Sequence, residues 1–390
     1  MTTKSKFEDA TGAVHLGRDP HANAGFVNPP VFRGSTVLFP TLAALKARSQ
    51  PYTYGRRATP TTVALTDALA ALDGAAASVL TCSGLQAVTA ALLAFVRAGD
   101  SILMVDTVYQ PTRKFCDTTL KSMGVETIYY DPLIGAGIAA LIRADTRLVF
   151  TESPGSQTFE MQDIPAIAEV TREKGIWLLM DNTWASPLLF KPLAHGVDVS
   201  IQAATKYIVG HADAMLGIIS GNERAAPHLD RVKEAFGLCP GSEETYLGLR
   251  GLRTLDVRLR RHHASGIEIG EWLAQRPEVA RVIHPALPNH PGHAIWKRDF
   301  NGASGLFAFT LKPVPEAALA AFVDHLELFG MGFSWGGYES LILPFDPRSY
   351  RSATTWSEPG PALRIHIGLE AVEDLKRDLA AGFDRLNAAR

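Results

Sequence analysis

The stretch that decides the fold is SVLTCSGLQAVTAALLAFVRAGDSILMVD, residues 78–106. It opens with an apolar run typical of a strand, SVLT at 78–81, and returns to a second one, SILMVD at 101–106. Between them, residues 85–100 carry an apolar helical pattern that Gly99 closes. Alternation of strand and helix in this way favours a mostly parallel sheet that helices cover on both faces.

The same alternation extends from residue 59 to residue 252. The helical pattern TTVALTDALAALDG at 61–74 precedes the first strand and ends at Gly74. Further short apolar runs bounded by polar residues follow the opening stretch, and each is of strand length. These strand candidates are ETIYYD (126–131), RLVFTE (147–152), IWLLMD (176–181), VSIQ (199–202) and GIIS (217–220). We therefore predict an α/β domain over residues 59–252.

The two ends of the chain differ from this central part. Residues 1–58 are rich in Pro, Gly, Thr and aromatic residues without a sustained period, which predicts an extended N-terminal arm. Residues 253–390 predict a smaller C-terminal α/β domain. Its expected elements are a long helix (252–275), two strands (GLFAFTL, 305–311; LRIHIGL, 363–369) and a final helix (371–386).

Composition excludes several classes of protein. The chain has 390 residues and a formal net charge of −2, so nothing in it points to nucleic acid or to an anionic membrane surface. Its three cysteines, Cys82, Cys116 and Cys239, lack the spacing of a zinc site or disulfide framework and fit a reducing compartment. The first 17 residues are polar, and no apolar run is long enough to span a membrane. We expect a cytoplasmic protein without a metal.

Polar residues that follow the apolar runs suggest a shared site, because ligands bind beyond the carboxyl ends of parallel strands. Ser83–Gly84 opens a helix whose N-terminus favours a phosphate. Asp181 follows one buried run, and Thr205–Lys206 follow another. A phosphate cradle, a carboxylate for a ring nitrogen and a lysine with a lowered pKa are what pyridoxal phosphate needs.

Longer motifs identify a family resemblance over almost the whole chain. In this order and spacing, the sequence is similar to the pyridoxal-phosphate enzymes of cysteine and methionine metabolism, of the fold-type I, aspartate aminotransferase-like superfamily. The matching motifs are YTYGRRATPT, SGLQA, DTVYQPT, ESPGS, MDNTWASP, ATKYIVGHAD, SWGGYESL and LRIHIGLE.

The resemblance implies the roles of the cofactor-binding residues. Lys206 would carry pyridoxal 5'-phosphate as a Schiff base and move protons, with Asp181 on the ring nitrogen and Tyr109 stacked on the ring. The backbone N–H groups of Gly84 and Leu85 would bind the phosphate. The hydroxyl of Thr205 would join them, and Tyr54 and Arg56 would reach the phosphate of a neighbouring subunit.

The resemblance also implies an amino-acid substrate and a reaction. Arg364 would clamp the substrate α-carboxylate, with Ser334, Trp335 and Tyr54 beside it. In LRIHIGL, Arg364 alternates with apolar residues and so points away from the apolar side of its strand. The motifs ESPGS, KYIVGH and SWGGYESL match the branch that cleaves L-cystathionine at the β carbon, giving homocysteine, pyruvate and ammonia. A homo-oligomer, a dimer of dimers, is implied.

Two positions depart from the family pattern. Ala203 stands three residues before the lysine, where many relatives have a serine that contacts the phosphate. The missing hydrogen bond would contribute a net free energy of roughly 1 kcal/mol to phosphate binding. Ser156 stands where many relatives have an asparagine near the phenolic oxygen of the cofactor. This second departure agrees with β-cleavage but leaves that contact open.

Three alternatives remain. One is γ-cleavage by a member of the same family, and another is a non-enzymatic regulator that kept the fold and its cofactor. The third is a dinucleotide dehydrogenase, since GAGIAA at 135–140 matches a dinucleotide fingerprint and Glu152 follows at a suitable distance. Asp131–Pro132 breaks the chain before those glycines, however, which speaks against the fingerprint.

Overall fold

A seven-stranded sheet forms the centre of the computed structural model, which describes residues 7–390. Its strand order is β1-β7-β6-β5-β4-β2-β3. Only β7 runs antiparallel to its neighbours, β1 and β6, so the sheet is mostly parallel as predicted. The strands are β1 (Ala77–Thr81), β2 (Ser101–Val105), β3 (Glu126–Tyr130), β4 (Thr146–Glu152), β5 (Trp177–Asp181), β6 (Val199–Gln202) and β7 (Gly217–Gly221).

Local sequence signals set the ends of the first helices. Thr59 and Thr62 form a capping box at the start of α3, where Pro60 occupies the first turn. Gly74 ends the helix with a φ of 69°, a conformation that favours glycine. The helices up to the end of the central sheet region are α3 (Pro60–Asp73), α4 (Gly84–Phe95), α5 (Gln110–Phe115), α6 (Ile164–Glu173), α7 (Ser186–Leu189), α8 (Ala226–Phe236) and α9 (Ser242–Leu252).

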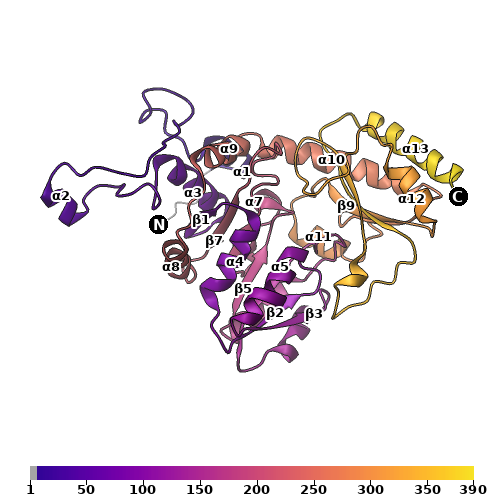
Figure 1. The fold of residues 1–390 in the computed structure, drawn as a ribbon, viewed down its shortest axis with the longest axis horizontal. Coiled ribbons are helices and arrows are strands. Elements are labelled where there is room, and N and C mark those ends of the chain that lie inside the picture. Colours follow the sequence, from indigo (N-terminus) through magenta and orange to yellow (C-terminus); the bar gives the residue numbers. More distant parts are fainter. Residues whose placement is uncertain (1–6) are drawn as a thin grey trace.

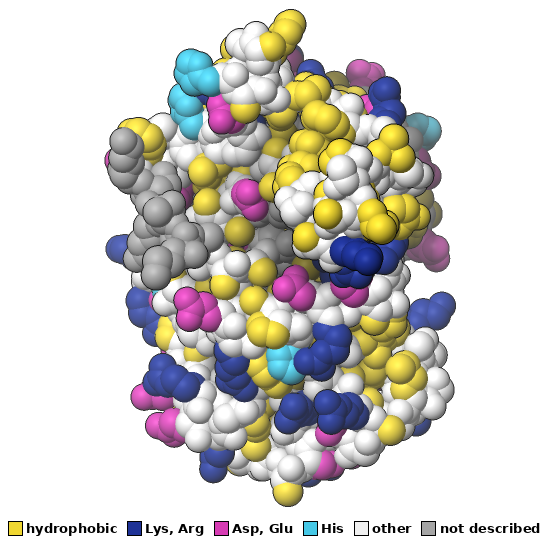
Figure 2. All heavy atoms as spheres, turned by 90° about the vertical axis from the view of Figure 1, so that its left-hand side faces the viewer, with side chains coloured by type: hydrophobic (Ala, Val, Ile, Leu, Met, Phe, Trp, Pro, Cys, Tyr) yellow, Lys and Arg dark blue, Asp and Glu magenta, His cyan; other side chains and the backbone are white. Residues whose placement is uncertain are grey.

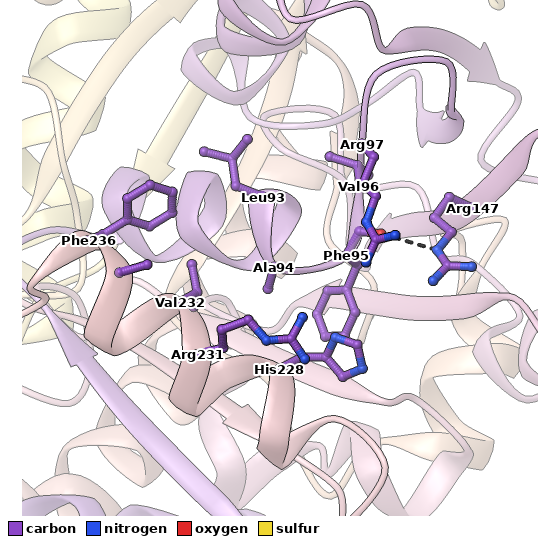
Figure 3. A pocket seen from close by; sticks show the side chains of 11 residues that line it. Leu93, Ala94, Phe95, Val96, Arg97, Arg147, His228, Arg231, Val232 and Phe236 are labelled. Carbon is purple, nitrogen blue, oxygen red and sulfur yellow. Dashed lines mark hydrogen bonds between the residues drawn. The ribbon is translucent and has the colours of Figure 1, made fainter.

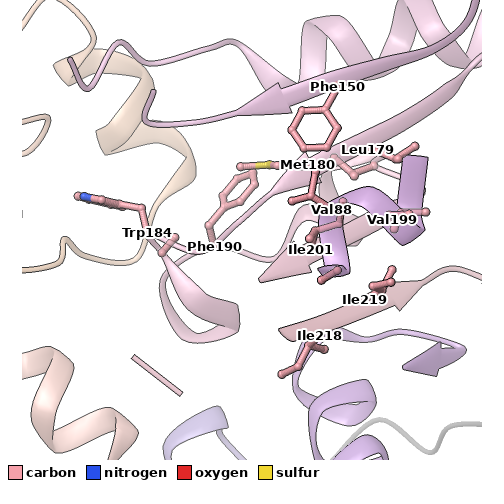
Figure 4. Packing of buried hydrophobic residues seen from close by; sticks show 14 of the residues in the cluster. Val88, Phe150, Leu179, Met180, Trp184, Phe190, Val199, Ile201, Ile218 and Ile219 are labelled. Carbon is pink, nitrogen blue, oxygen red and sulfur yellow. The ribbon is translucent and has the colours of Figure 1, made fainter. Parts of the chain in front are cut away.

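The main core lies between this sheet and its helices. Leu179 of β5, Val199 and Ile201 of β6 and Ile219 of β7 are fully buried with Val88 of α4 (Figure 4). Each buried side chain of this kind contributes about 1.5–3 kcal/mol of transfer free energy. Near-continuous apolar runs are therefore what hold the strands in the middle of the sheet.

A second sheet forms in the C-terminal part, with the order β10-β11-β9-β8 and all pairs antiparallel. Two of its strands were not predicted: β8 (Val279–Ile283) and β10 (Leu341–Phe345). The long helix expected from residue 252 begins instead at Leu255, after α9 has ended. The remaining elements are β9 (Leu306–Leu311), β11 (Ala362–His366), α10 (Leu255–Ala274), α11 (His293–Asp299), α12 (Glu316–Val323) and α13 (Val372–Ala388).

Only part of the N-terminal segment projects away from both sheets (Figure 1). Helix α1 (Asp9–His15) packs on α3 and α10, whereas α2 (Leu42–Ala47) lies far out on the projecting chain. Residues 1–6 of the predicted arm lie outside the described residues. Within residues 7–390, no helix is both long and apolar enough to cross a membrane.

A buried carboxylate joins the two parts of the chain. Asp106, directly after β2, is fully buried and accepts a hydrogen bond from Arg113 Nη2 at 2.5 Å. It also accepts from the backbone N–H of Ser352 (3.0 Å) and Thr354 (2.8 Å), which belong to the C-terminal part. Burial alone would raise the pKa of Asp106, but these hydrogen bonds and the Arg113 charge together hold it below its usual value. The carboxylate therefore fastens the segment after β10 to the central sheet.

Replacing Asp106 should destabilise the protein strongly. Asp106→Ala leaves the buried Arg113 guanidinium unpaired, a loss of about 3–5 kcal/mol in the free energy of unfolding. The matched control is Asp346→Ala, which removes the partner of Arg348 from an exposed pair and should cost less than about 1 kcal/mol. Urea unfolding of both variants measures the difference. Equal losses would mean that Asp106 does not fasten the two parts.

Candidate active site

The polar residues at the strand ends meet around one cavity of about 560 Å³. Strands β2, β4, β5 and β6 are parallel neighbours, so their carboxyl ends lie along the same edge of the sheet. The C-terminal part supplies the opposite wall. The predicted site residues that line the cavity are Gly84, Leu85, Tyr109, Asp181, Thr205, Lys206, Ser334, Trp335 and Arg364.

Lys206 lies in the turn that follows β6, and its side chain reaches across the cavity. Its Nζ donates to Ser334 Oγ at 2.5 Å and lies 5.2 Å from the centre of the Trp335 ring. Burial and the Arg364 charge lower the pKa of Lys206 to about 8, while Asp181 opposes that shift. The amine is therefore neutral at mildly alkaline pH, as a nucleophilic lysine needs to be.

Asp181 occupies the last position of β5 and is held in one orientation. Its Oδ1 accepts from both the backbone N–H (2.9 Å) and the hydroxyl (2.5 Å) of Thr183. Burial raises the pKa of Asp181, whereas the two Thr183 hydrogen bonds and the charge of Lys206 act in the opposite direction. Because both bonds fall on Oδ1, the other carboxylate oxygen is left to accept from a ligand.

The N-terminus of α4 forms a cradle for an anion. The Ser83 hydroxyl caps the helix by accepting from Gln86 N–H at 3.1 Å, and the preceding N–H groups of Gly84 and Leu85 have no partner within the helix. A Cβ on Gly84 would lie 2.3 Å from that of Ala203, so this position needs glycine. The close contact also gives Ala203 a packing role, which a larger side chain would disturb.

Thr205 is close to the cradle but already engaged. Its hydroxyl accepts from Leu216 N–H at 2.9 Å and lies 3.1 Å from Leu216 O. To donate to a phosphate, this hydroxyl would have to turn away from the carbonyl of Leu216.

Tyr109 stands at the start of α5, and the residue is 46% exposed. Burial of its hydroxyl and the nearby carboxylates of Glu152 and Asp181 raise its pKa, and Arg364 opposes them. Its backbone N–H donates to Glu152 Oε2 at 2.8 Å. The aromatic ring therefore borders the cavity from a fixed main-chain position.

Glu152 is a cavity residue that the sequence analysis assigned no role in this site. It ends β4 and is the register partner of Asp181 on β5. The sequence signal that could have identified Glu152 is the one used for Asp181, namely a carboxylate directly after an apolar run. Thr183 and Phe333 also line the cavity and were not predicted.

Arg364 enters the cavity from β11 of the second sheet. Its strand neighbours Leu363 and Ile365 are buried in the core of the C-terminal part, which confirms that Arg364 points the other way. Its Nη2 donates to Ser334 O at 2.9 Å and to Gly332 O at 3.3 Å. Burial lowers its pKa to about 10, so the guanidinium remains charged at neutral pH.

The segment from Ser334 to Gly336 packs directly over the lysine. Ser334 has a φ of 78°, an unusual value for a residue with a side chain. A Cβ on Gly336 would lie 3.1 Å from the Cβ of Lys206, which shows how closely the two segments approach. The Trp335 ring packs on Tyr207, with their centres 5.4 Å apart.

Tyr54 and Arg56 do not line the cavity of their own chain. Tyr54 forms an isolated bridge with Thr36 of the arm, and Arg56 Nη2 lies 3.6 Å from a Glu234 carboxylate oxygen of α8. Their assignment to a neighbouring subunit stays a prediction.

These groups fit pyridoxal phosphate. The uncapped N–H groups of α4 suit its phosphate, the free oxygen of Asp181 suits its ring nitrogen, and Lys206 lines the same cavity with an amine for its aldehyde. The dinucleotide alternative fails because Gly135–Leu141 form a 3₁₀-helix that starts after the turn following β3.

A second, smaller cavity of about 170 Å³ lies away from this site, between α4 and α8 (Figure 3). Arg147, at the amino end of β4, donates from Nε to Phe95 O at 3.2 Å there. Because this is the opposite end of the parallel strands, the cavity contains none of the predicted site residues.

Comparisons with known proteins agree on the family of this chain. The chain is 53% identical over 387 residues to a "Putative cystathionine beta-lyase" of Rhizobium johnstonii, covering 97% of this chain and 96% of that protein. It is 45% identical to "Cystathionine beta-lyase MetC" of Escherichia coli, covering 96% and 98%. A crystal structure of cystathionine gamma synthase from Xanthomonas oryzae, with aminoacrylate and cysteine, has a TM-score of 0.91 at 33% identity, covering 99% and 100%. The family described as "Cys/Met metabolism PLP-dependent enzyme" matches residues 10–384, and the chain belongs to that family.

Proposed function

We propose that this chain is a cystathionine β-lyase that converts L-cystathionine and water into L-homocysteine, pyruvate and ammonia. The observation that carries the proposal is the contact of Lys206 with Ser334, beside Trp335 and Arg364, in a cavity that fits pyridoxal phosphate. The higher identity to β-lyases (45–53%) than to the γ-synthase (33%) supports cleavage at the β carbon. The free cysteines agree with a cytoplasmic enzyme.

The residues of the chain would divide the work between binding and proton transfer. When bound, pyridoxal phosphate supplies an electron sink for the bond-breaking steps at the substrate. Arg364 would hold the substrate α-carboxylate with its planar guanidinium. Neutral Lys206 would take the proton from Cα, and Lys206 or a tyrosine would return one to the departing sulfur. Asp181 would hold a proton at the ring nitrogen.

Product analysis with L-cystathionine tests this function. Homocysteine with pyruvate means that the Cβ–S bond breaks, whereas cysteine with 2-oxobutyrate means that the Cγ–S bond breaks. The second result would replace the proposal by γ-cleavage within the same family. Cofactor binding without either product would favour the non-enzymatic alternative.

Uptake of the cofactor should follow the low pKa of Lys206. Only the neutral amine attacks pyridoxal phosphate, so the rate should rise about tenfold per pH unit up to about pH 8 and then level off. An unshifted lysine would let the rate rise until the pH passes about 10.4. The growth of visible absorbance in cofactor-free protein measures the rate, and Lys206→Ala should show none.

Measuring the pH dependence of cofactor uptake in Arg364→Gln tests whether the positive charge of Arg364 lowers the pKa of Lys206. Removing the positive guanidinium should raise the pKa of Lys206 and move the levelling point to higher pH. A levelling point that stays fixed or falls would contradict the electrostatic explanation.

Replacing Arg364, the proposed carboxylate clamp, should weaken the use of the substrate without loss of the cofactor. Arg364→Ala leaves the substrate carboxylate unpaired, a loss on the order of 2–5 kcal/mol. We expect kcat/KM for cystathionine to fall by at least ~30-fold while the visible absorbance of the cofactor persists. Arg364→Lys should also be poor, because an ammonium cannot form the bidentate pair. Near-normal kcat/KM in Arg364→Ala would place the clamp elsewhere.

We also propose that the arm, residues 1–58, completes the site of a second subunit. It carries exposed apolar side chains, and hydrophobic atoms gather on the face of the molecule that bears it (Figure 2). Exposed patches of this kind mark interfaces. The exposed apolar residues of the arm are Phe7, Val14, Phe26, Val27, Phe32, Leu38, Leu42, Leu45 and Tyr54.

Mixed subunits test this assignment. Arg56→Ala and Lys206→Ala should each be inactive, and mixing them should restore part of the activity, because each mixed dimer contains one intact site. Subunit exchange is verified independently by a tag on one variant. Exchange without recovered activity would mean that the arm serves its own chain.

A further inference from the structure

Glu152 lies between two residues to which the proposed function gives roles. Strand β4 stands between β5 and β2 in the sheet. On one side Glu152 is the register partner of Asp181, and on the other its Oε2 accepts the backbone N–H of Tyr109 at 2.8 Å. One side chain thus connects the two parts of the site that are expected to hold the ring nitrogen and the ring face.

The two carboxyl groups are register neighbours that line one cavity, which disfavours ionisation of both. Register partners on parallel strands point to the same face, and both side chains line the cavity. Neighbouring carboxylates in a poorly hydrated site share a single negative charge, as in other paired-carboxylate sites. We therefore expect one of the two groups to keep a proton.

The surrounding donors decide which group keeps it. Asp181 receives two hydrogen bonds from Thr183 and shares the cavity with the cation of Lys206. Among the hydrogen bonds in residues 7–390, the Glu152 carboxyl receives one, from Tyr109. In agreement, burial and the charge of Asp181 raise the pKa of Glu152 well above its usual value, and only the Tyr109 N–H opposes them. The titratable and charged groups that line the cavity together with Glu152 are Tyr109, Asp181, Lys206, Tyr350 and Arg364.

We propose that Glu152 is a protonated positioning residue. Its Oε2 fixes the main chain of Tyr109, its second oxygen carries the proton, and the single negative charge of the pair remains on Asp181. This inference deepens the proposed function and rests on it for the roles of Tyr109 and Asp181.

Three substitutions at position 152 distinguish the effect of the proton from the effect of the length of the side chain. Glu152→Gln keeps the length and the acceptor oxygen without an ionisable group, so kcat/KM should stay within about threefold of wild type. Glu152→Asp and Glu152→Ala lose the contact with Tyr109, and misplacement of that ring should lower kcat/KM by about 10²-fold. The levelling pH of cofactor uptake should be unchanged in Glu152→Gln, because no charge has been removed.

Opposite results overturn the proposal. If Glu152 were an anion, Glu152→Gln would remove a negative charge from the cavity that Lys206 also lines and move the levelling point to lower pH. A Glu152→Gln variant that is as impaired as Glu152→Ala, but unfolds at the same temperature as the wild type, would also indicate that Glu152 acts as an anion. Full activity in all three variants would show that Glu152 positions nothing.

Infrared spectroscopy of the cofactor-free protein tests the proton directly and without turnover. The carbonyl band of a protonated carboxylic acid should be present at pH 8, where buried Asp73 with its pKa raised to about 6 is ionised, and the band should be absent in Glu152→Gln. Glu173→Gln, at an exposed position at the end of α6, is the matched control and should leave the band unchanged. A wild-type protein without this band contradicts the proposal. Absence of cystathionine cleavage with the band intact would instead refute the proposed function and leave the protonation of Glu152 standing.

Discussion

The alignment of strand ends along one edge of the sheet is the constraint on which the site depends. Strands β6, β5, β4 and β2 are parallel neighbours, and each carries a polar residue at or just beyond its carboxyl end. Lys206, Asp181, Glu152 and Tyr109 therefore stand in that order along the edge. Because the sheet behind them is apolar, charge effects among these groups are stronger than they would be in water.

The cavity also depends on the packing of the C-terminal part over that edge. Arg364 reaches the cavity because its strand buries the alternate side chains in a separate core. The carbonyl of Ser334 accepts from Arg364, and its hydroxyl accepts from Lys206. Ser334 thus connects the expected clamp to the expected nucleophile. The buried Asp106 pair holds another segment of the same part, so it also helps to keep the C-terminal part packed on the central sheet.

The sequence predicted the central sheet well because its strands are short apolar runs, most of them buried on both faces, a pattern that can be recognised without tertiary information. It failed for β8 and β10, whose patterns are weaker. Strand β10 contains Pro344, which speaks against a strand, but β10 is an edge strand, and an edge strand tolerates proline. Helix α1 was missed because a helix of seven residues gives no sustained period.

The site was predictable where one residue follows one strand, as for Asp181 and Lys206. It was not predictable where the contact joins distant segments. Lys206 and Ser334 are separated by 128 positions, and no local pattern specifies their 2.5 Å hydrogen bond. Glu152, like Asp181, is a carboxylate at the end of an apolar run. Only the register of β4 on β5, however, shows that the two residues are neighbours.

Charge balance connects the proposed protonation of Glu152 with the ligands of the site. Lys206 and Arg364 bring positive charge, and the N-terminus of α4 adds a partial positive charge. If both carboxyl groups were ionised, they would offset the two side-chain cations, and the cavity would lose most of its attraction for anions. With the proton on Glu152, a single negative charge remains on Asp181, and the cavity keeps an excess of positive charge. A phosphate and a substrate carboxylate are both anions, so the proton on Glu152 favours the binding of both.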